Sequence, residues 1–96
     1  MDDIQFIWDE QKNIINIAKH GVNFAEAAKV YFDPERLEFY DGKHSTMGEE
    51  RWNIIGNVNM KTLFVVITIK VDNLVRIISA RQATKNEQEE YYGNRS

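Results

Sequence analysis

The stretch 51–80 alternates three apolar segments with two short polar turns, and no other feature of the chain restricts the fold as strongly. The segments read RWNIIGNV, TLFVVITIK and LVRIISA, and they are rich in the β-branched residues that strands favour. Turns as short as NVNMK and VDN allow no crossover, so consecutive segments must pair antiparallel. The segment at 62–70 is the most apolar of the three, which predicts a place at the centre of a sheet.

Two further strands are expected before this meander, at 4–8 and 37–41, because both alternate bulky apolar residues with polar ones. Between the second of these and the meander, the segment GKHSTMGEE at 42–50 shows no periodicity and contains two glycines. Such a composition is typical of a loop.

A first helix is predicted over residues 10–20. Asp9 is a suitable N-cap for this helix, and Gly21 is suited to the left-handed C′ position that ends it. Apolar residues at helical spacing form a stripe that we expect to face the core, namely Ile14, Ile17 and Ala18.

A second helix is predicted to begin after Asn23, which forms a capping-box pattern with Glu26. The dipeptide Asp33-Pro34 should end it, because the residue before a proline is disfavoured in helical conformation. The residues that we expect to face inward from this helix are Phe24, Ala27, Ala28 and Tyr31.

A third helix is predicted near the C-terminal end, where Thr84 and Glu87 form another capping box ahead of Tyr91 and Tyr92. The element order is then β-α-α-β-β-β-β-α, in a single domain spanning residues 1–96. This order predicts an α+β fold, with helices packed on one face of a mostly antiparallel sheet.

Composition excludes several classes of function. The chain has no cysteine, so disulfides, thiolate metal sites and thiol nucleophiles are ruled out. No apolar run could cross a bilayer, and acidic residues stand where a signal peptide would be positive, so a cytoplasmic location is expected. His20 and His44 match no metal-ligand spacing, and no Gly-rich phosphate loop is present, so we expect neither a metal nor a cofactor.

Three arginines are the main candidate site residues. Arg51 opens a strand, Arg76 lies within the last strand, and Arg81 follows it. A guanidinium presents a planar fork of donors that matches a phosphate group and stays charged at every relevant pH. Strand parity puts Arg76 and Arg81 on opposite faces, so the chain must turn or bulge near 79–80 if both are to converge. The alternative is that each arginine pairs with a carboxylate, such as Glu49, Glu50 or Glu87.

Histidine and aromatic residues allow more than one interpretation. His20 ends the first helix, where it either helps to stop the helix or takes part in a site. His44 lies in the 42–50 loop and is either a proton donor or acceptor near neutral pH or a solvated residue. Trp52 is expected in the core. For the remaining aromatics the choice between packing and stacking on nucleic-acid bases stays open, as for Tyr40, Tyr91 and Tyr92.

Several of these residues lie in three longer segments, FIWDEQKNIINIAKHGVNFAEAA, GEERWNIIG and VRIISARQATKNEQEEY. These segments resemble the BrnT-type toxins of prokaryotic type II toxin–antitoxin systems, within the RelE-like superfamily. They occur in the family's order and cover the chain from Phe6 to about Tyr91. The most specific parts are Trp8-Asp9, Lys19-His20-Gly21-Val22, Glu50-Arg51 and RIISAR at 76–81.

This resemblance implies a RelE-like α+β fold. It also implies a metal-independent endoribonuclease that uses the 2′-hydroxyl of its RNA substrate as nucleophile and inhibits translation. It implies catalytic roles for Arg51, Arg76 and Arg81, which would stabilise the charged transition state, and for His20 of the K-H-G motif. It also implies a BrnA-like antitoxin with a ribbon-helix-helix domain, which neutralises the toxin in a hetero-oligomer and alone contacts operator DNA.

The charge distribution leaves a second class of function open. Residues 1–50 carry five Lys and Arg against eleven Asp and Glu, whereas residues 51–96 carry seven against four, for a net charge of −3. A chain that is not basic attracts free RNA only weakly. The charge balance therefore favours a non-catalytic interaction module whose arginines dock a partner's carboxylates, while the arginine cluster and the resemblance favour the enzyme.

Overall fold

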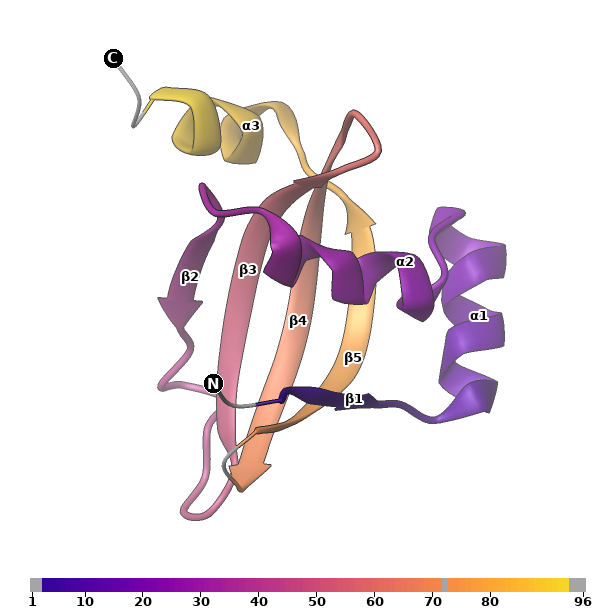
Figure 1. The fold of residues 1–96 in the computed structure, drawn as a ribbon, viewed down its shortest axis with the longest axis vertical. Helices are drawn as coiled ribbons and strands as arrows, with labels where there is room; N and C mark the ends of the chain where they lie inside the picture. The colour runs from indigo at the N-terminus through magenta and orange to yellow at the C-terminus, as the bar shows by residue number, and fades with distance from the viewer. Residues whose placement is uncertain (1–2, 72, 94–96) are drawn as a thin grey trace.

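The computed structural model describes residues 3–71 and 73–93, and within them five strands form one sheet in the order β1-β5-β4-β3-β2 (Figure 1). The elements follow the predicted order β-α-α-β-β-β-β-α, and the α+β class is confirmed. Their bounds are β1 Gln5–Ile7, α1 Glu10–His20, α2 Phe24–Ala28, the 3₁₀ helix η1 Lys29–Phe32, β2 Leu37–Tyr40, β3 Glu50–Val58, β4 Lys61–Val71, β5 Leu74–Gln82 and α3 Lys85–Gly93.

The strands β3, β4 and β5 form the predicted antiparallel meander, with β4 at the centre of the sheet. Asn59 and Met60 join β3 to β4 with positive φ angles of 51° and 69°, the left-handed pair that a tight two-residue hairpin uses. The predicted turn at 71–73 includes Asp72, which lies outside the described residues. β1 adds parallel to β5 at one edge, and β2 adds antiparallel to β3 at the other.

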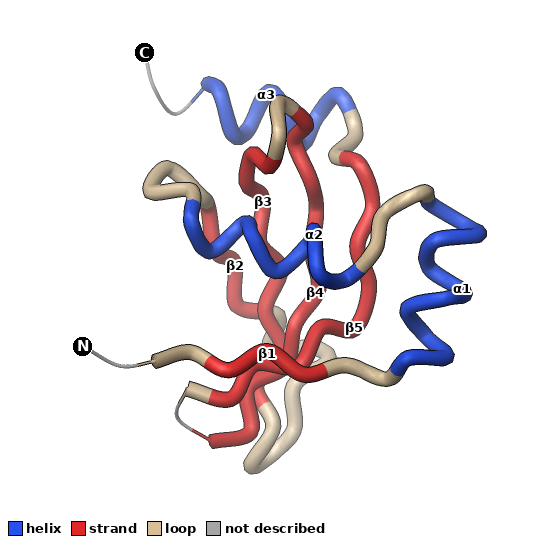
Figure 2. Tube along the Cα trace, turned by 45° about the vertical axis from the view of Figure 1, so that its right-hand side comes forward, coloured by secondary structure: helices blue, strands red, loops and turns tan. Residues whose placement is uncertain are grey.

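α2 covers one face of the sheet and closes the core (Figure 2). The Asn23 side chain accepts a hydrogen bond from the Glu26 N–H at 2.7 Å, which fixes the start of the helix as predicted. Ala28 and Tyr31 pack against the core, also as predicted. The core consists of residues from the α1–α2 connection, α2, η1 and the facing side of the strands: Val22, Phe24, Ala27, Val30, Ile54, Val58, Leu63, Val65, Ile67, Val75, Ile77 and Ala80.

α1 begins and ends where the sequence predicts, but it lies beside the sheet instead of on its face (Figures 1 and 2). The Asp9 carboxylate accepts from the Gln11 N–H at 2.8 Å, and Gly21 ends the helix at φ 73°. The prediction that Ile14, Ile17 and Ala18 face the core was wrong. Ile14 and Ile17 are 52% and 44% exposed, and Ala18 is exposed as well.

The helix buries two asparagines instead, because its neighbour is the edge of β5. The Asn16 carboxamide accepts from the Ala80 N–H at 3.1 Å and donates to the Ala80 carbonyl at 2.7 Å. Asn13 accepts from the Phe24 N–H at 2.8 Å. A strand edge presents unpaired backbone groups, which require polar partners and not apolar ones. The hydrophobic stripe of α1 therefore points outward.

A capping box begins α3, and one buried aromatic ring holds the helix against the rest of the fold. The Thr84 N–H donates to Glu87 at 2.8 Å, and the Glu87 N–H donates to the Thr84 hydroxyl at 3.2 Å, as predicted. Tyr91 is buried, and its hydroxyl donates to the Asp33 carboxylate. Trp52 packs against the core, as expected. No helix in the described part of the chain is long and apolar enough to span a membrane.

Candidate functional site

A β-bulge in β5 decides where two of the candidate arginines point. The pairing of β5 with β4 shifts by one residue between Ile77 and Ser79, which leaves Ile78 as an extra residue. Without this residue, Arg76 and Arg81 would lie on opposite faces of the sheet. With it, both lie on the side away from α2, which we call the open face. The β-bulge that is needed to place Arg76 and Arg81 on the same face is therefore present.

The open face is ordered into three rows that cross β3, β4 and β5, with neighbouring rows about 7 Å apart along the strands. Each row joins residues that are paired in register. The arginine row is Arg51–Thr68–Arg76, the middle row is Asn53–Val66–Ser79, and the aromatic row is Ile55–Phe64–Arg81.

The arginine row contains two buried polar atoms without a partner in the described part of the chain. Among the described residues, neither Nε of Arg76 nor Oγ1 of Thr68 makes a hydrogen bond. An unsatisfied buried polar group costs about 1–3 kcal/mol, and such groups are rare in folded proteins. Two such atoms on adjacent strands make the arginine row a candidate functional site. Sequence reasoning missed Thr68, although a hydroxyl flanked by isoleucines within an apolar strand is a signal that could have found it.

Arg51 is positioned by the loop before β3. Its backbone N–H donates to the Ser45 hydroxyl at 2.8 Å, and that hydroxyl donates to the backbone carbonyl of Asp41 at 2.7 Å. Asp41 pairs with His44 at 2.8 Å, and hydrogen bonding from His44 lowers the pKa of this carboxyl, with the charge of Arg51 contributing least. Within the described residues the Arg51 guanidinium has no ion pair of its own.

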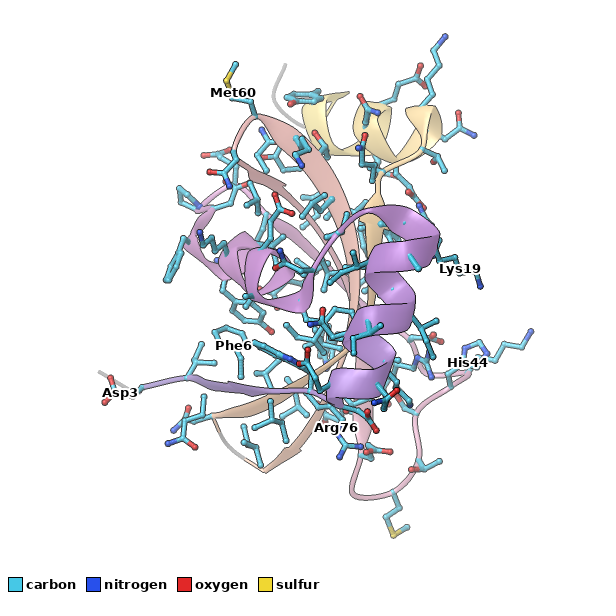
Figure 3. The ribbon with its side chains drawn as sticks, turned by 90° about the vertical axis from the view of Figure 1, so that its right-hand side faces the viewer. Asp3, Phe6, Lys19, His44, Met60 and Arg76 are labelled. Atoms are coloured by element: carbon cyan, nitrogen blue, oxygen red, sulfur yellow. The ribbon has the colours of Figure 1, made fainter. Side chains whose placement is uncertain are left out.

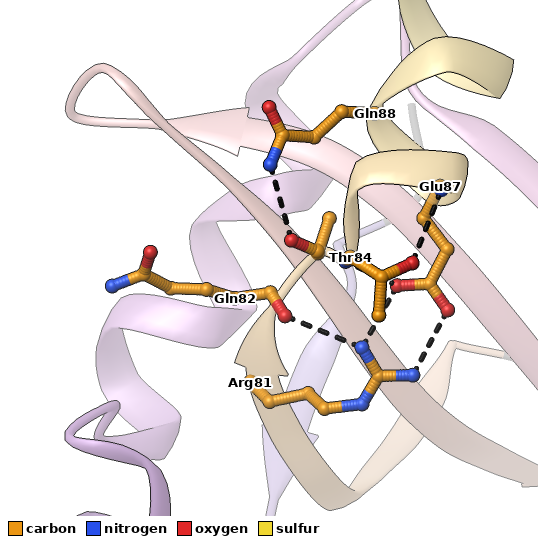
Figure 4. A network of polar contacts seen from close by, with 6 residues as sticks. Arg81, Gln82, Thr84, Glu87 and Gln88 are labelled. Atoms are coloured by element: carbon orange, nitrogen blue, oxygen red, sulfur yellow. Dashed lines mark hydrogen bonds and ion pairs between the residues drawn. The ribbon is translucent and has the colours of Figure 1, made fainter.

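Arg81 follows the alternative that the sequence left open, because it pairs with a carboxylate. Its two terminal nitrogens meet the two Glu87 oxygens at 2.8 Å and 2.9 Å (Figure 4). Its guanidinium also lies over the Phe64 ring, 4.3 Å from the centroid. Hydrogen bonding from Arg81 lowers the pKa of Glu87, and the same bonds raise the pKa of Arg81. The guanidinium is therefore held flat in one orientation, with its fork occupied.

His20 is brought to the β5 side of the open face. It lines a hollow of about 190 Å³ between the C-terminal end of α1 and the bulge, together with Ile78 and Ser79. Ser79 belongs to the middle row, between the positions of Arg76 and Arg81. Lys19 and His44 extend on the same side of the sheet, away from α2 (Figure 3).

A second hollow, of about 310 Å³, lies at the α3 end of the open face. Its floor includes Ile55 and Phe64 of the aromatic row, and its far wall is α3. It is lined by Phe39, Asn53, Ile55, Phe64, Asn86, Glu87 and Glu90. Glu87 lines this hollow and binds Arg81, whose guanidinium lies over the Phe64 ring. The Arg81–Glu87 pair therefore links the hollow to the aromatic row.

Comparison with known proteins identifies the family. The model of the family described as "Ribonuclease toxin, BrnT, of type II toxin-antitoxin system" matches residues 8–87. The chain belongs to the BrnT toxin family. The matched range includes all four candidate residues, namely His20, Arg51, Arg76 and Arg81.

A solved structure supports the BrnT assignment. The chain resembles the crystal structure of the Brucella abortus ribonuclease toxin BrnT with 27% sequence identity and a TM-score of 0.66. The alignment covers 85% of this chain and 99% of that chain. No curated protein matches the sequence. Membership of the BrnT family implies an RNA substrate and an antitoxin partner.

Proposed function

We propose that the chain is an endoribonuclease toxin that cleaves RNA by attack of the RNA's own 2′-hydroxyl, without a metal ion, and so inhibits translation. The observation that carries the proposal is the arginine row, where Nε of Arg76 and Oγ1 of Thr68 lack partners among the described residues. In residues 3–71 and 73–93 no three His, Asp or Glu side chains are grouped as ligands for a metal ion. The proposed chemistry is accordingly built from arginine and histidine.

The arginine row suits the charge that develops in this reaction. Attack of the 2′-oxygen on phosphorus places added negative charge on the non-bridging phosphate oxygens. Arg51 and Arg76 flank Thr68 across β4, and their backbones are two strand spacings, or about 10 Å, apart. Two long side chains can converge over Thr68 from these positions and hold the phosphate between them. Their forks are available because no carboxylate among the described residues occupies them.

Proton transfer is proposed for His20. An imidazole can accept the 2′-hydroxyl proton or protonate the leaving 5′-oxygen near neutral pH. His20 lines the hollow beside Ser79, which neighbours the arginine row along β5. Arg81 keeps a place in the site, but its fork is engaged by Glu87, so we propose that it acts on the RNA indirectly.

The antitoxin is proposed to be a BrnA-like protein with a ribbon-helix-helix domain that holds the toxin in a stable hetero-oligomer. The outward-facing residues of α1 support a protein partner, since Ile14, Ile15 and Ile17 are each exposed apolar side chains on this one helix. The purified pair should stay associated on dilution to nanomolar concentration, as size-exclusion chromatography would show. Separation at that dilution would contradict the proposal.

The proposed reaction has a chemical signature. Attack by the 2′-oxygen must leave a 2′,3′-cyclic phosphate on one product and a 5′-hydroxyl on the other. The purified chain should generate these ends from single-stranded RNA in the presence of a chelator, and expression of the chain alone should arrest growth until the antitoxin is supplied. Products with 5′-phosphates, or cleavage that stops on chelation, would rule out this chemistry.

A non-catalytic interaction module is the second candidate function. The net charge of −3 favours it, and so does Arg81, which already binds a carboxylate within the chain. In that case Arg51 and Arg76 would bind carboxylates of the partner. Soluble, folded chain that neither cleaves RNA nor arrests growth would favour this function over the ribonuclease.

A further inference from the structure

The hollow at the α3 end of the open face combines features that fit a nucleobase. Its apolar surface comes from Phe39, which is 41% exposed, and from Ile55 and Phe64. Its volume of about 310 Å³ lies at the small end of the range for ligand sites, which suits one flat ring system better than an oligonucleotide. Aromatic side chains bind any base by stacking on its π-face.

Two carboxamides in this hollow have no hydrogen-bond partner within residues 3–71 and 73–93. Asn13, Asn16 and Asn57, which also lie in helices or strands, use their side chains in hydrogen bonds within the chain. Asn53 and Asn86 make no side-chain hydrogen bond to any described residue, and both line the hollow. A carboxamide carries a donor and an acceptor side by side, the arrangement that reads the edge of a base.

Charge and position determine which part of an RNA strand enters. Asn53 lies two residues from Arg51 on the same face of β3, a distance of about 7 Å. Glu87 and Glu90 line the α3 wall, and because Arg81 is paired with Glu87 the wall offers a phosphate no uncompensated positive charge among the described residues. Carboxylate oxygens do accept hydrogen bonds from the amino groups of bases. A strand whose phosphate lies over the arginine row would therefore turn a neighbouring base, and not its backbone, into the hollow.

Arg81 is the residue that shapes this site. Its fork holds the Glu87 carboxylate, and its guanidinium covers the Phe64 ring, so it fixes two of the lining side chains at once. The Glu87 carboxylate is tied a second time by the Thr84 N–H of the capping box. Arg81 is accordingly a positioning residue for the hollow, and its fork is not free to bind the scissile phosphate.

We infer that the hollow is a subsite for one base of the RNA next to the scissile phosphate, and that it prefers a base with an exocyclic amino group over uracil. The inference rests on the proposed ribonuclease function. It adds to that function a specificity site in which Asn53 and Asn86 read the edge of the base and Phe39 stacks on it.

The test compares short single-stranded RNAs that differ by one base at each position beside the cleavage site. The wild-type chain should cleave RNAs with an amino-bearing base at one position about tenfold faster than those with uracil there. In Asn86→Ala and Asn53→Ala this ratio should fall towards one, and Phe39→Ala should slow cleavage of all RNAs by about tenfold. The matched control is Phe32→Ala, an aromatic that is 79% exposed on η1 and should change neither quantity.

A binding measurement separates the inference from the proposed function. Short 2′-deoxy oligonucleotides cannot be cleaved by this chemistry, but their bases should shift the side-chain amide NMR signals of Asn53 and Asn86. Shifts without cleavage of RNA would retain the subsite and overturn the ribonuclease. Cleavage with the same base ratio in the wild type and both asparagine variants would overturn the subsite and retain the ribonuclease. Loss of antitoxin binding in these variants, with the base ratio unchanged, would assign the hollow to the protein partner and also overturn the subsite.

Discussion

Arg76 and Thr68 face each other across β5 and β4, and each carries a buried polar atom that no described residue satisfies. Arg81, five positions further along the same strand, has its whole fork satisfied by Glu87. The environments of the two arginines therefore differ: Arg76 has an unsatisfied donor, whereas Arg81 is bound to a carboxylate. The sequence alone does not distinguish them. Substitutions should separate these roles in measurements of activity and stability.

Arg76→Ala should slow RNA cleavage by about a hundredfold or more, because it removes a charged donor aimed at the transition state. The melting temperature should not fall, since Arg76 gives up no hydrogen bond to a described residue. Arg76→Lys should recover little activity, because an ammonium cannot reproduce the planar fork. Cleavage assays and thermal melting on both variants test this. An alanine variant that melts early and cleaves in proportion to its folded fraction would make Arg76 a structural residue. Arg51→Ala, assayed in the same way, should also lose activity.

Arg81→Ala should lower the stability of the fold by about 1 kcal/mol, or roughly 5 °C in melting temperature. The value is modest because the Arg81–Glu87 pair is partly exposed. Arg36→Ala is a matched control, since Arg36 also pairs with a carboxylate, Glu38, and lies over an aromatic ring, Tyr31. Both variants should melt earlier, but only Arg81→Ala should alter base preference after correction for the folded fraction. Equal preference in the two variants would confine Arg81 to stability.

The Arg81–Glu87 pair should make stability depend on pH in the acid range. Hydrogen bonding from Arg81 holds the pKa of Glu87 below its ordinary value of 4.5 in the folded state. The pair therefore stabilises the fold fully above that value and loses its effect as the pH falls through the lowered pKa. Denaturant unfolding of the wild type and Glu87→Gln should differ most near neutral pH and converge in acid. A constant difference at all pH values would mean that the carboxyl does not titrate with folding.

His20→Gln should slow cleavage by about a hundredfold without affecting the melting temperature, because His20 is exposed and its proposed task is proton transfer. His44→Gln is the comparison, as His44 is a second exposed histidine on the same side, paired with Asp41. The pH–rate profile of cleavage should lose its dependence on one ionising group in the His20 variant alone. If the His44 variant loses it instead, the proton-transfer group is the His44–Asp41 pair.

Asn16→Leu should destabilise the chain by about 2 kcal/mol or more, although it adds an apolar residue to a helix. The change leaves the Ala80 N–H and carbonyl without the carboxamide that now satisfies them. Ile15→Lys on the same helix should change stability by less than about 0.5 kcal/mol, because Ile15 is 61% exposed. Chemical denaturation measures both. The Ile15 variant should also bind the antitoxin more weakly, and unchanged affinity would exclude α1 from that interface.

Local signals in the sequence determined the elements of this protein and their ends. Asp9 and Gly21 cap α1, and Thr84 and Glu87 cap α3, because each acts on backbone groups only a few residues away. Alternation within 51–80 and the shortness of its turns determined the antiparallel meander, because strands joined by such short turns can pair only in antiparallel orientation.

Tertiary structure alone decided what these elements do together. The bond that seats α1 joins Asn16 to Ala80, 64 positions apart, and the extra residue Ile78 shows only in the pairing of β5 with β4. The Asn16 bond satisfies backbone groups of β5, whereas the bulge leaves Ile78 unpaired; both features depend on a partner that lies elsewhere in the chain. A periodic pattern shows which side chains of a helix are apolar, but it does not show which strand edge the helix will pack against. The outward face of α1 and the convergence of Arg76 with Arg81 on one side of the sheet therefore emerged only when the sheet was assembled.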